Sequence, residues 1–234
     1  QLFVIFSFII IAYLAFSRSK KSEQNLVWAG MAKETAHQIG TPLSSLMAWV
    51  EILKNKKGMT EISHEINKDV KRLETITSRF SKVGSKPNLS IQDIYTLLNQ
   101  NVLYLQDRLS SNILIKLKNQ CTDSKAPINS TLFDWAIENI CKNAADAMDG
   151  KGIIKIKLFC ESDYLKIDIT DNGKGLQKGN FKRIFEPGFT SKKRGWGLGL
   201  SLSKRIIEEY HLGRLYVKNS SKDGTTFRIS LHRN

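Results

Sequence analysis

The chain opens with an uncharged apolar run. Residues 2–16 read LFVIFSFIIIAYLAF, in which only Ser7 is a small polar interruption, and a basic cluster follows directly. A bilayer core takes about 20 apolar residues, and basic residues are typical of the cytoplasmic flank of a membrane helix. We therefore expect residues 1–17 to be the C-terminal part of a transmembrane helix in the inner cell membrane, with residues 18–234 cytoplasmic. A signal peptide would carry its basic residues before the apolar run.

Two helical patterns follow the apolar run. From Ile39 to Leu53 apolar residues recur in alternating steps of four and three, which predicts a helix that starts near Glu23. A second stripe of the same kind covers residues 62–83, after a turn at Gly58. Two helices with one stripe each form a hairpin that still exposes apolar surface, and pairing of two hairpins into a four-helix bundle buries it.

The pattern changes after a linker at residues 84–88, so we expect a homodimer through residues 18–86 and a second domain over residues 88–234. Helical and alternating patterns are mixed in this second part, which predicts helices on one face of a mixed sheet, an α+β sandwich. Ser130 is the expected N-cap of the second of its helices. Helices are predicted at 91–109, 131–148 and 200–210, and strands at 112–119, 153–160, 164–170, 214–218 and 225–231.

Charge and cysteine content narrow the function classes. The 234 residues carry 36 Lys and Arg against 22 Asp and Glu, a net charge of +14, which favours anionic partners such as phosphates or a membrane surface. No block interleaves basic and aromatic residues, so a nucleic-acid partner is not predicted. The three cysteines are odd in number and lack metal-ligand spacing. They argue against a disulfide scaffold and indicate a reducing compartment.

Three polar segments of the second domain carry candidate chemistry. Within the predicted helix 131–148, Asn139 and Asn143 share one face, and their amides suit phosphate and the oxygen ligation that Mg²⁺ prefers. Asp171 follows a predicted strand and leads into a Gly-x-Gly turn. The segment 195–199, Gly-Trp-Gly-Leu-Gly, opens a helix, where backbone N–H groups meet phosphate. Each segment alone is equally typical of a solvated helix face or a turn.

Together and in this order, the three segments resemble the ATP-binding domain shared by sensor histidine kinases, type II topoisomerases, mismatch-repair ATPases and heat-shock ATPase chaperones. The resemblance implies binding of ATP with Mg²⁺, contact of Asp171 with the adenine amino group, ligation of Mg²⁺ by Asn143, and an ATP lid over residues 186–198. It places further cofactor-binding residues at Asn139, Gly173, Gly175, Lys192, Gly195, Gly197, Gly199 and Thr225.

The first helix contains a histidine in an unusual setting. His37 points away from the apolar stripe, Thr41 lies one turn further on the same face, and Pro42 removes a helical hydrogen bond at a cost of roughly 3 kcal/mol. The segment resembles the phosphoacceptor box of sensor histidine kinases. This implies that His37 attacks the γ-phosphorus of ATP and that the phosphoryl group passes to an aspartate of a separate response regulator.

One position differs from the usual family residue, and a second distinguishes the hydrolytic members of the superfamily from the others. Gln38 stands where the family usually has Glu or Asp, and an amide can orient the imidazole but cannot accept its proton. Glu34 or water then serves as base, or the protein is a weak kinase that acts mainly as a response-regulator phosphatase or scaffold, with Thr41 placing water. In hydrolytic relatives a Glu occupies the position of Asn139 and activates water, whereas Glu138 here is turned about 100° round the helix. Phosphoryl transfer is therefore expected rather than hydrolysis.

Overall fold

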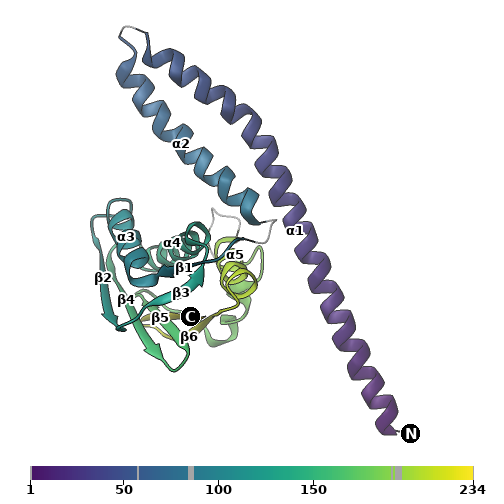
Figure 1. The fold of residues 1–234 in the computed structure, drawn as a ribbon. Helices are drawn as coiled ribbons and strands as arrows, with labels where there is room; N and C mark the ends of the chain where they lie inside the picture. Colours follow the sequence, from purple (N-terminus) through teal and green to yellow (C-terminus); the bar gives the residue numbers. More distant parts are fainter. Residues whose placement is uncertain (1, 57, 84–86, 191, 193–196, 234) are drawn as a thin grey trace. The chain divides into compact units, whose positions relative to one another are not determined.

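The computed structural model describes residues 2–56, 58–83, 87–190, 192 and 197–233, without the side chains of 2, 17–35, 37, 38, 41, 72, 80, 81 and 83. The chain divides into two compact units, Gln1–Lys86 and Pro87–Asn234 (Figure 1). Each unit is built around its own set of buried side chains.

The first unit is a helical hairpin. Helix α1 (Leu2–Lys54) is followed by a turn at Gly58, which has a positive φ of 83°, and α2 (Thr60–Val83) folds back along α1 (Figure 1). Buried side chains of both helices meet in one small apolar cluster, which consists of Leu43, Val50 and Val70. Outside the cluster many large apolar side chains stay exposed: Leu46, Met47, Trp49, Ile52, Ile62, Ile66, Leu73 and Ile76.

The hairpin corrects the expected start of its first helix. Helix α1 begins at Leu2 rather than near Glu23, because residues 17–22 contain no proline or glycine that would end a helix. No helix in the described parts of the chain is long and apolar enough to cross a membrane.

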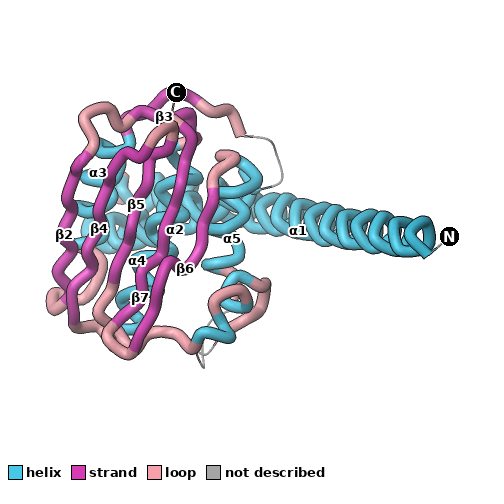
Figure 2. The backbone as a smooth tube through the Cα atoms, turned by 90° about the horizontal axis from the view of Figure 1, so that it is seen from below, coloured by secondary structure: helices cyan, strands magenta, loops and turns pink. Residues whose placement is uncertain are grey.

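The second unit is built on a mixed sheet in the order β2-β4-β5-β7-β6. Strands β2 and β4 pair in parallel and the other neighbours are antiparallel. Helices cover one face of the sheet, as the predicted α+β sandwich requires, and no helix in the described part of this unit lies on the opposite face (Figure 2). The strands are β2 (Ile113–Gln120), β4 (Gly152–Glu161), β5 (Tyr164–Thr170), β6 (Arg214–Ser221) and β7 (Gly224–His232). The helices are α3 (Ile94–Gln106), α4 (Ser130–Ala147) and α5 (Gly199–Arg205).

The core lies between the helices and the sheet. Every second residue of the strands points inward, so Ile154, Ile156 and Leu158 of β4 are fully buried, while α4 contributes Phe133 and Ile140. Three short helical turns complete the helical elements. They are the 3-10 turns η1 (Lys178–Asn180) and η2 (Arg183–Phe185), and the π-helical turn η3 (Ile206–Tyr210), which continues α5.

Local hydrogen bonds shift two of the predicted helix starts. The first residues of the predicted helix 91–109 belong instead to β1 (Ser90–Asp93), which pairs with an unpredicted strand, β3 (Lys125–Ile128). Asp93 ends that strand and caps α3, since its carboxylate accepts the N–H of Thr96 at 3.2 Å. Helix α4 is capped by Asn129 rather than by Ser130, because the Asn129 side chain accepts the N–H of Leu132.

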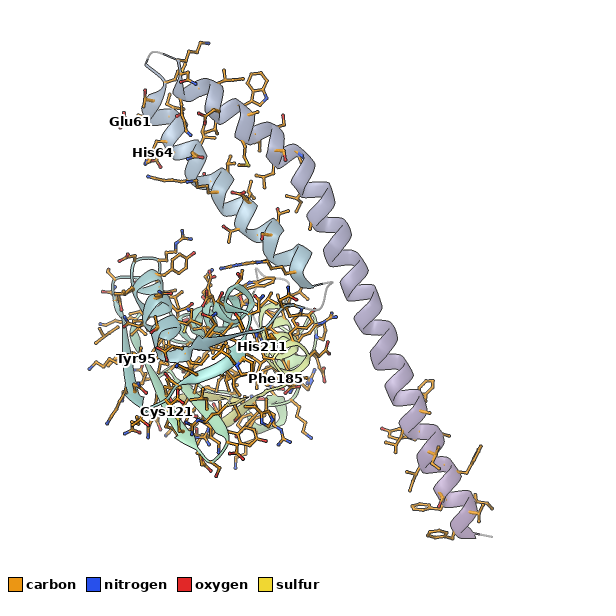
Figure 3. All side chains as sticks on the ribbon, in the orientation of Figure 1. Glu61, His64, Tyr95, Cys121, Phe185 and His211 are labelled. Carbon is orange, nitrogen blue, oxygen red and sulfur yellow. A yellow bond between two sulfur atoms is a disulfide. The ribbon has the colours of Figure 1, made fainter. Side chains whose placement is uncertain are left out.

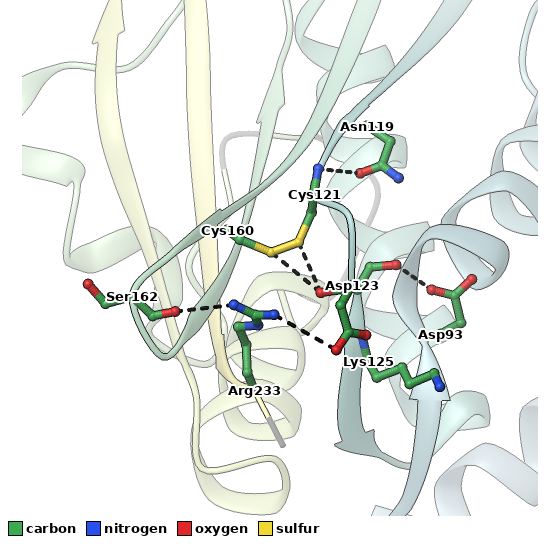
Figure 4. The surroundings of a disulfide bond; sticks show 9 residues. Asp93, Asn119, Cys121, Asp123, Lys125, Cys160, Ser162 and Arg233 are labelled. Atoms are coloured by element: carbon green, nitrogen blue, oxygen red, sulfur yellow. Dashed lines mark hydrogen bonds and ion pairs between the residues drawn. A yellow bond between two sulfur atoms is a disulfide. The ribbon is translucent and has the colours of Figure 1, made fainter.

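The second unit contains one disulfide, which the sequence analysis did not predict. Cys121 directly follows β2, and the parallel register that sets Gln120 beside Phe159 sets Cys121 beside Cys160, with the two Cα atoms 5.2 Å apart in a disulfide (Figure 4). The odd cysteine is Cys141, which is fully buried in α4, and its burial raises the pKa of its thiol to about 12. The disulfide thus ties the edge strand β2 to β4.

We expect loss of the disulfide to lower the stability of the second unit. A bridge that spans 39 residues of sequence restricts the unfolded chain by about 2–4 kcal/mol. Urea unfolding of wild type with and without a thiol reductant measures this difference. The Cys121→Ser/Cys160→Ser double variant should match the reduced wild type and should not respond to reductant, and equal midpoints for oxidised and reduced wild type would contradict the expectation.

Candidate functional site

One pocket of about 730 Å³ lies along α4, the start of α5 and the segments that follow β5. Polar side chains of α4 form one wall, and glycine-containing loops form the others. Eight of the predicted cofactor-binding residues line it: Asn139, Asn143, Asp171, Gly175, Lys192, Gly197, Gly199 and Thr225. Gly173 lies directly beside it and holds Asp171, and Gly195 lies outside the described residues.

The two asparagines of α4 are held in fixed orientations. The Nδ2 of Asn143 donates to the Asn139 carbonyl at 2.8 Å, so the Asn143 Oδ1 is the amide atom left for the pocket. The Nδ2 of Asn139 donates to the Gly199 carbonyl at 3.4 Å and so links α4 to the start of α5. The Asn139 amide therefore joins α4 to α5, whereas the Asn143 amide oxygen faces the pocket.

A lysine ammonium group is hydrogen-bonded to the Asn143 side-chain oxygen. The Lys192 ammonium donates to Asn143 Oδ1 at 3.0 Å and also contacts the Asp146 carboxylate. Oxygen donors of this kind suit Mg²⁺, so the residues present fit a magnesium ion at this place. In the described chain no group of three or more His, Cys, Asp and Glu could hold a metal, and a metal bound here would take most of its ligands from water or phosphate.

Asp171 is the buried carboxylate of the pocket, with only 4% of its surface exposed. Its Oδ1 accepts the N–H groups of Gly173 at 2.9 Å and Thr225 at 3.2 Å. Its Oδ2 has no hydrogen-bond partner among the described residues. Burial raises the pKa of Asp171, and the two N–H hydrogen bonds act in the opposite direction. One oxygen is thus locked and the other is available to a donor on a ligand.

The glycines after Asp171 allow the backbone to approach other segments closely. A Cβ on Gly173 would lie 2.5 Å from the Ala147 carbonyl oxygen. Gly175 has a φ of +70°, and a Cβ there would lie 1.7 Å from the Ser221 carbonyl oxygen. Any side chain at these positions would therefore have to displace the backbone at Ala147 or Ser221.

The predicted lid, residues 186–198, is closed on itself by backbone contacts at its described ends. The Gly188 N–H donates to the Gly197 carbonyl at 3.2 Å. Phe185, directly before the lid, packs edge-on against Phe227 with ring centroids 6.2 Å apart (Figure 3). These contacts anchor the lid to β7.

Glu138 does not reach the pocket. Its side chain is 4% exposed, and its Oε1 forms an ion pair with the Lys142 ammonium at 2.6 Å. The residue at the pocket face is its neighbour Asn139. The separation round the helix is the one expected from the sequence, and no described carboxylate takes the place of a water-activating Glu at that position.

His211 is a positioning residue that the sequence analysis missed. Its ring is buried beside Phe133 (Figure 3); Nε2 accepts the Asn129 N–H at 3.0 Å, and Nδ1 lies 2.8 Å from the Ile206 carbonyl. Because Asn129 caps α4, this histidine fixes the start of the helix that carries both asparagines. A single histidine after a helix gives no sequence signal for such a role.

The predicted phosphoacceptor segment lies in the other unit. Backbone residues 37–41 are part of the continuous helix α1, and Pro42 lies inside that helix without ending it. The side chains of His37, Gln38 and Thr41 lie outside the described residues.

Comparison with known proteins gives a consistent result. Residues 129–234 match the family described as histidine kinase-, DNA gyrase B-, and HSP90-like ATPase. Sporulation kinase D of Bacillus subtilis is 30% identical over 92% of this chain and 44% of its own length. Sporulation kinase E of the same organism is 29% identical over 92% of this chain and 30% of its own, and sensor histidine kinase ZraS of Escherichia coli is 28% identical over 91% and 47%. The chain spans less than half the length of these relatives.

Solved structures share the fold. The catalytic domain of histidine kinase ThkA has a TM-score of 0.58 at 23% identity, covering 63% of this chain and 97% of that domain. ThkA in complex with the response regulator TrrA has a TM-score of 0.60 at 20% identity and covers 95% of this chain and 66% of that one. Full-length ShkA in complex with AMPPNP has a TM-score of 0.66 at 17% identity, over 86% and 45%.

We expect the burial of His211 to make stability depend on pH. Burial lowers its pKa below the usual value of 6.5, so the folded state holds the neutral ring. That contribution to the free energy of unfolding is fully present above about pH 6.5 and is lost as pH falls through the lowered pKa. Urea unfolding between about pH 7 and pH 5 should give a flatter profile for His211→Gln than for wild type. The exposed His64→Gln control should keep the wild-type slope, and equal slopes for all three proteins would refute the assignment.

Proposed function

We propose that the chain is a histidine kinase core of two-component signalling, because residues 129–234 match the histidine kinase-, DNA gyrase B-, and HSP90-like ATPase family and the chain is similar to sensor histidine kinases. ATP phosphorylates His37, and the phosphoryl group then passes to an aspartate of a response regulator. The observation that carries the proposal is the meeting of Asp171 and Asn143 in one pocket.

Asp171 selects the base of the nucleotide. Its Oδ1 is held by two backbone N–H groups, which leaves Oδ2 to accept a hydrogen bond from the adenine amino group. A charge-assisted bond of this kind in a buried place is stronger than one in water. Guanine presents a carbonyl where adenine presents an amine, so the same carboxylate discriminates against GTP.

Asn143 and Lys192 serve the phosphate end. Asn143 Oδ1 would hold Mg²⁺, which when bound neutralises charge on the phosphates. Lys192 now occupies that oxygen and would leave it for the phosphate oxygens. Gly197 and Gly199 open α5 beside both residues, so the helix N-terminus offers its N–H groups to the same phosphates.

His37 is the proposed nucleophile. A neutral imidazole nitrogen attacks the γ-phosphorus, a P–N bond forms, and the P–O bond to ADP breaks. Gln38 orients the ring, and the proton passes to Glu34 or to water, since an amide cannot take it. Asn139 at the position of the hydrolytic Glu, with Glu138 buried against Lys142, supports transfer over hydrolysis.

The exposed apolar face of the hairpin supports a homodimer through residues 18–86. Leu46, Ile66 and Leu73 each keep more than a third of their surface exposed, and a second hairpin would cover them in a four-helix bundle. The structure of ThkA with TrrA supports a response regulator as the second partner. Thr41, one turn from His37, would then place water for hydrolysis of the phosphorylated regulator.

Replacement of Asp171 by Asn should weaken ATP binding. The amide would turn a donor or a weaker acceptor toward the adenine amine, and an unmet buried hydrogen bond costs about 1–3 kcal/mol. Titration with a fluorescent ATP analogue should therefore show roughly tenfold or greater loss of affinity. Asp223→Asn, the same chemical change in the exposed turn between β6 and β7, is the matched control, and equal affinities of the two variants would count against the adenine contact.

Replacement of His37 by Gln should abolish autophosphorylation. With γ-labelled ATP and Mg²⁺, wild type should acquire a base-stable, acid-labile label, as a phosphoramidate does, and His37→Gln should acquire none. His64→Gln, an exposed histidine of α2 (Figure 3), should label normally. Label retained in His37→Gln would refute the assignment. Absence of label from all three proteins, despite ATP binding, would point to a phosphatase or a scaffold instead.

A further inference from the structure

Among the described residues of the second unit, no helix covers one face of the sheet (Figure 2). On β2 and β4 four of the residues that point to this face are lysines, while their neighbours Ile154 and Ile156 point into the core. We call the four exposed lysines of these two strands the lysine grid: Lys116, Lys118, Lys155 and Lys157.

The register sets these lysines directly against each other. Lys116 is the cross-strand partner of Lys155, and Lys118 is that of Lys157. Like charges in directly opposed positions destabilise a sheet. Among the described residues, no ion pair joins any of the four to a carboxylate. The grid therefore brings four lysines together without an ion pair, although Lys157 also lies opposite Asp168 of β5 and over the Phe159 ring.

The other half of the same face holds its charges mostly in ion pairs. Asp168 accepts both nitrogens of a bidentate Arg228 at 2.6 and 2.7 Å and also pairs with Lys218 at 3.0 Å. Lys166 pairs with Glu161 at 2.6 Å. Cations thus outnumber carboxylates on this half as well, and the grid differs in that its lysines form no ion pair among the described residues.

Protection of a sheet edge does not account for the grid. Lysines on an edge strand prevent pairing with other chains, and β2 is such an edge. Strand β4 is not, because it lies between β2 and β5, and yet it carries half of the grid. The arrangement calls for an anionic partner that lies across both strands.

The neighbouring side chains favour a lipid surface over a nucleic acid. Stacking of bases needs free aromatic faces, but the Phe159 ring is already engaged by the Lys157 ammonium at 5.2 Å and by the Arg228 guanidinium at 5.1 Å. Leu114, in line with the grid on β2, is 47% exposed. Lysines spread over two adjacent strands beside an exposed apolar side chain match a planar anionic interface.

We propose that the lysine grid docks the second unit on an anionic lipid bilayer. The ammonium groups would lie among the lipid phosphates, with Leu114 at the depth of the headgroups. The nucleotide pocket involves α4 and the start of α5, which cover the opposite face of the sheet (Figure 2), so docking would leave it open. The partner is recognised by surface charge and not by the identity of one headgroup.

Co-sedimentation of the full chain with vesicles tests the proposal. Phosphatidylcholine vesicles with and without phosphatidylglycerol are compared at low and high salt, for wild type, Lys155→Glu/Lys157→Glu and Lys178→Glu/Lys182→Glu. The last variant makes the same charge change at exposed lysines outside the sheet. We expect the anionic vesicles to bind Lys155→Glu/Lys157→Glu at least about tenfold more weakly than wild type. Lys178→Glu/Lys182→Glu and Lys155→Arg/Lys157→Arg should stay close to wild type.

The comparison separates the grid from other contacts. The exposed apolar side chains of residues 3–16 would bind neutral and anionic vesicles alike, and the basic residues that follow them would add salt-sensitive binding to anionic vesicles. Only the difference between wild type and Lys155→Glu/Lys157→Glu is therefore attributed to the grid. Equal binding of the two double-Glu variants would overturn the proposal. So would grid-dependent binding to a single-stranded oligonucleotide that is tighter than binding to the vesicles. Unchanged affinity of Lys155→Glu/Lys157→Glu for the ATP analogue would confirm that the variant is folded.

Discussion

The site depends on one buried carboxylate oxygen, Asp171 Oδ1, that holds two backbone segments together. It accepts N–H groups from Gly173 and Thr225, while the Asp171 N–H donates to the Thr225 carbonyl at 3.0 Å. The end of β5 is thus pinned to the start of β7. Gly224 allows this approach, because a Cβ there would lie 2.0 Å from the Asp171 carbonyl oxygen. Without these contacts the second carboxylate oxygen would have no fixed direction.

Much of the architecture could be predicted because periodicity reports burial directly. The Ile-Lys alternation of residues 153–157 predicts a strand with one buried face, and the structure confirms it. The two four-residue strands β1 and β3 could not be found in this way, since a four-residue strand shows too little alternation and β3 contains Pro127. Their pairing is fixed by Asp93, whose carboxylate both caps α3 and accepts from Ser124. Such tertiary contacts have no local signal.

The same distinction between local patterns and long-range contacts applies to the site. Asn139, Asn143 and the glycines after Asp171 were predicted because their chemistry lies in short segments with a recognisable spacing. The Lys192 contact with Asp146 joins residues 46 apart, and the His211 bond to Asn129 joins residues 82 apart. Both contacts exist only in the folded chain, as does the cross-strand meeting of Cys121 and Cys160. The sequence indicates which groups can act, and the fold decides which groups hold them in place.

The charged side chains of the second unit differ between the pocket and the open face of the sheet. Among the described residues the pocket has three cations, Lys142, Lys174 and Lys192, against three carboxylates, Asp146, Asp149 and Asp171. A phosphate there would be held by directed donors rather than by a net positive charge. On the open sheet face, burial opposes ionisation of Asp168, but the hydrogen bonds from Arg228 and Lys218 outweigh it and lower its pKa, so part of the charge of β5, β6 and β7 is held in ion pairs. The excess lysines of β2 and β4 serve neither the pocket nor the sheet, and an opposed row of like charges that lowers stability persists where an external anion offsets its cost.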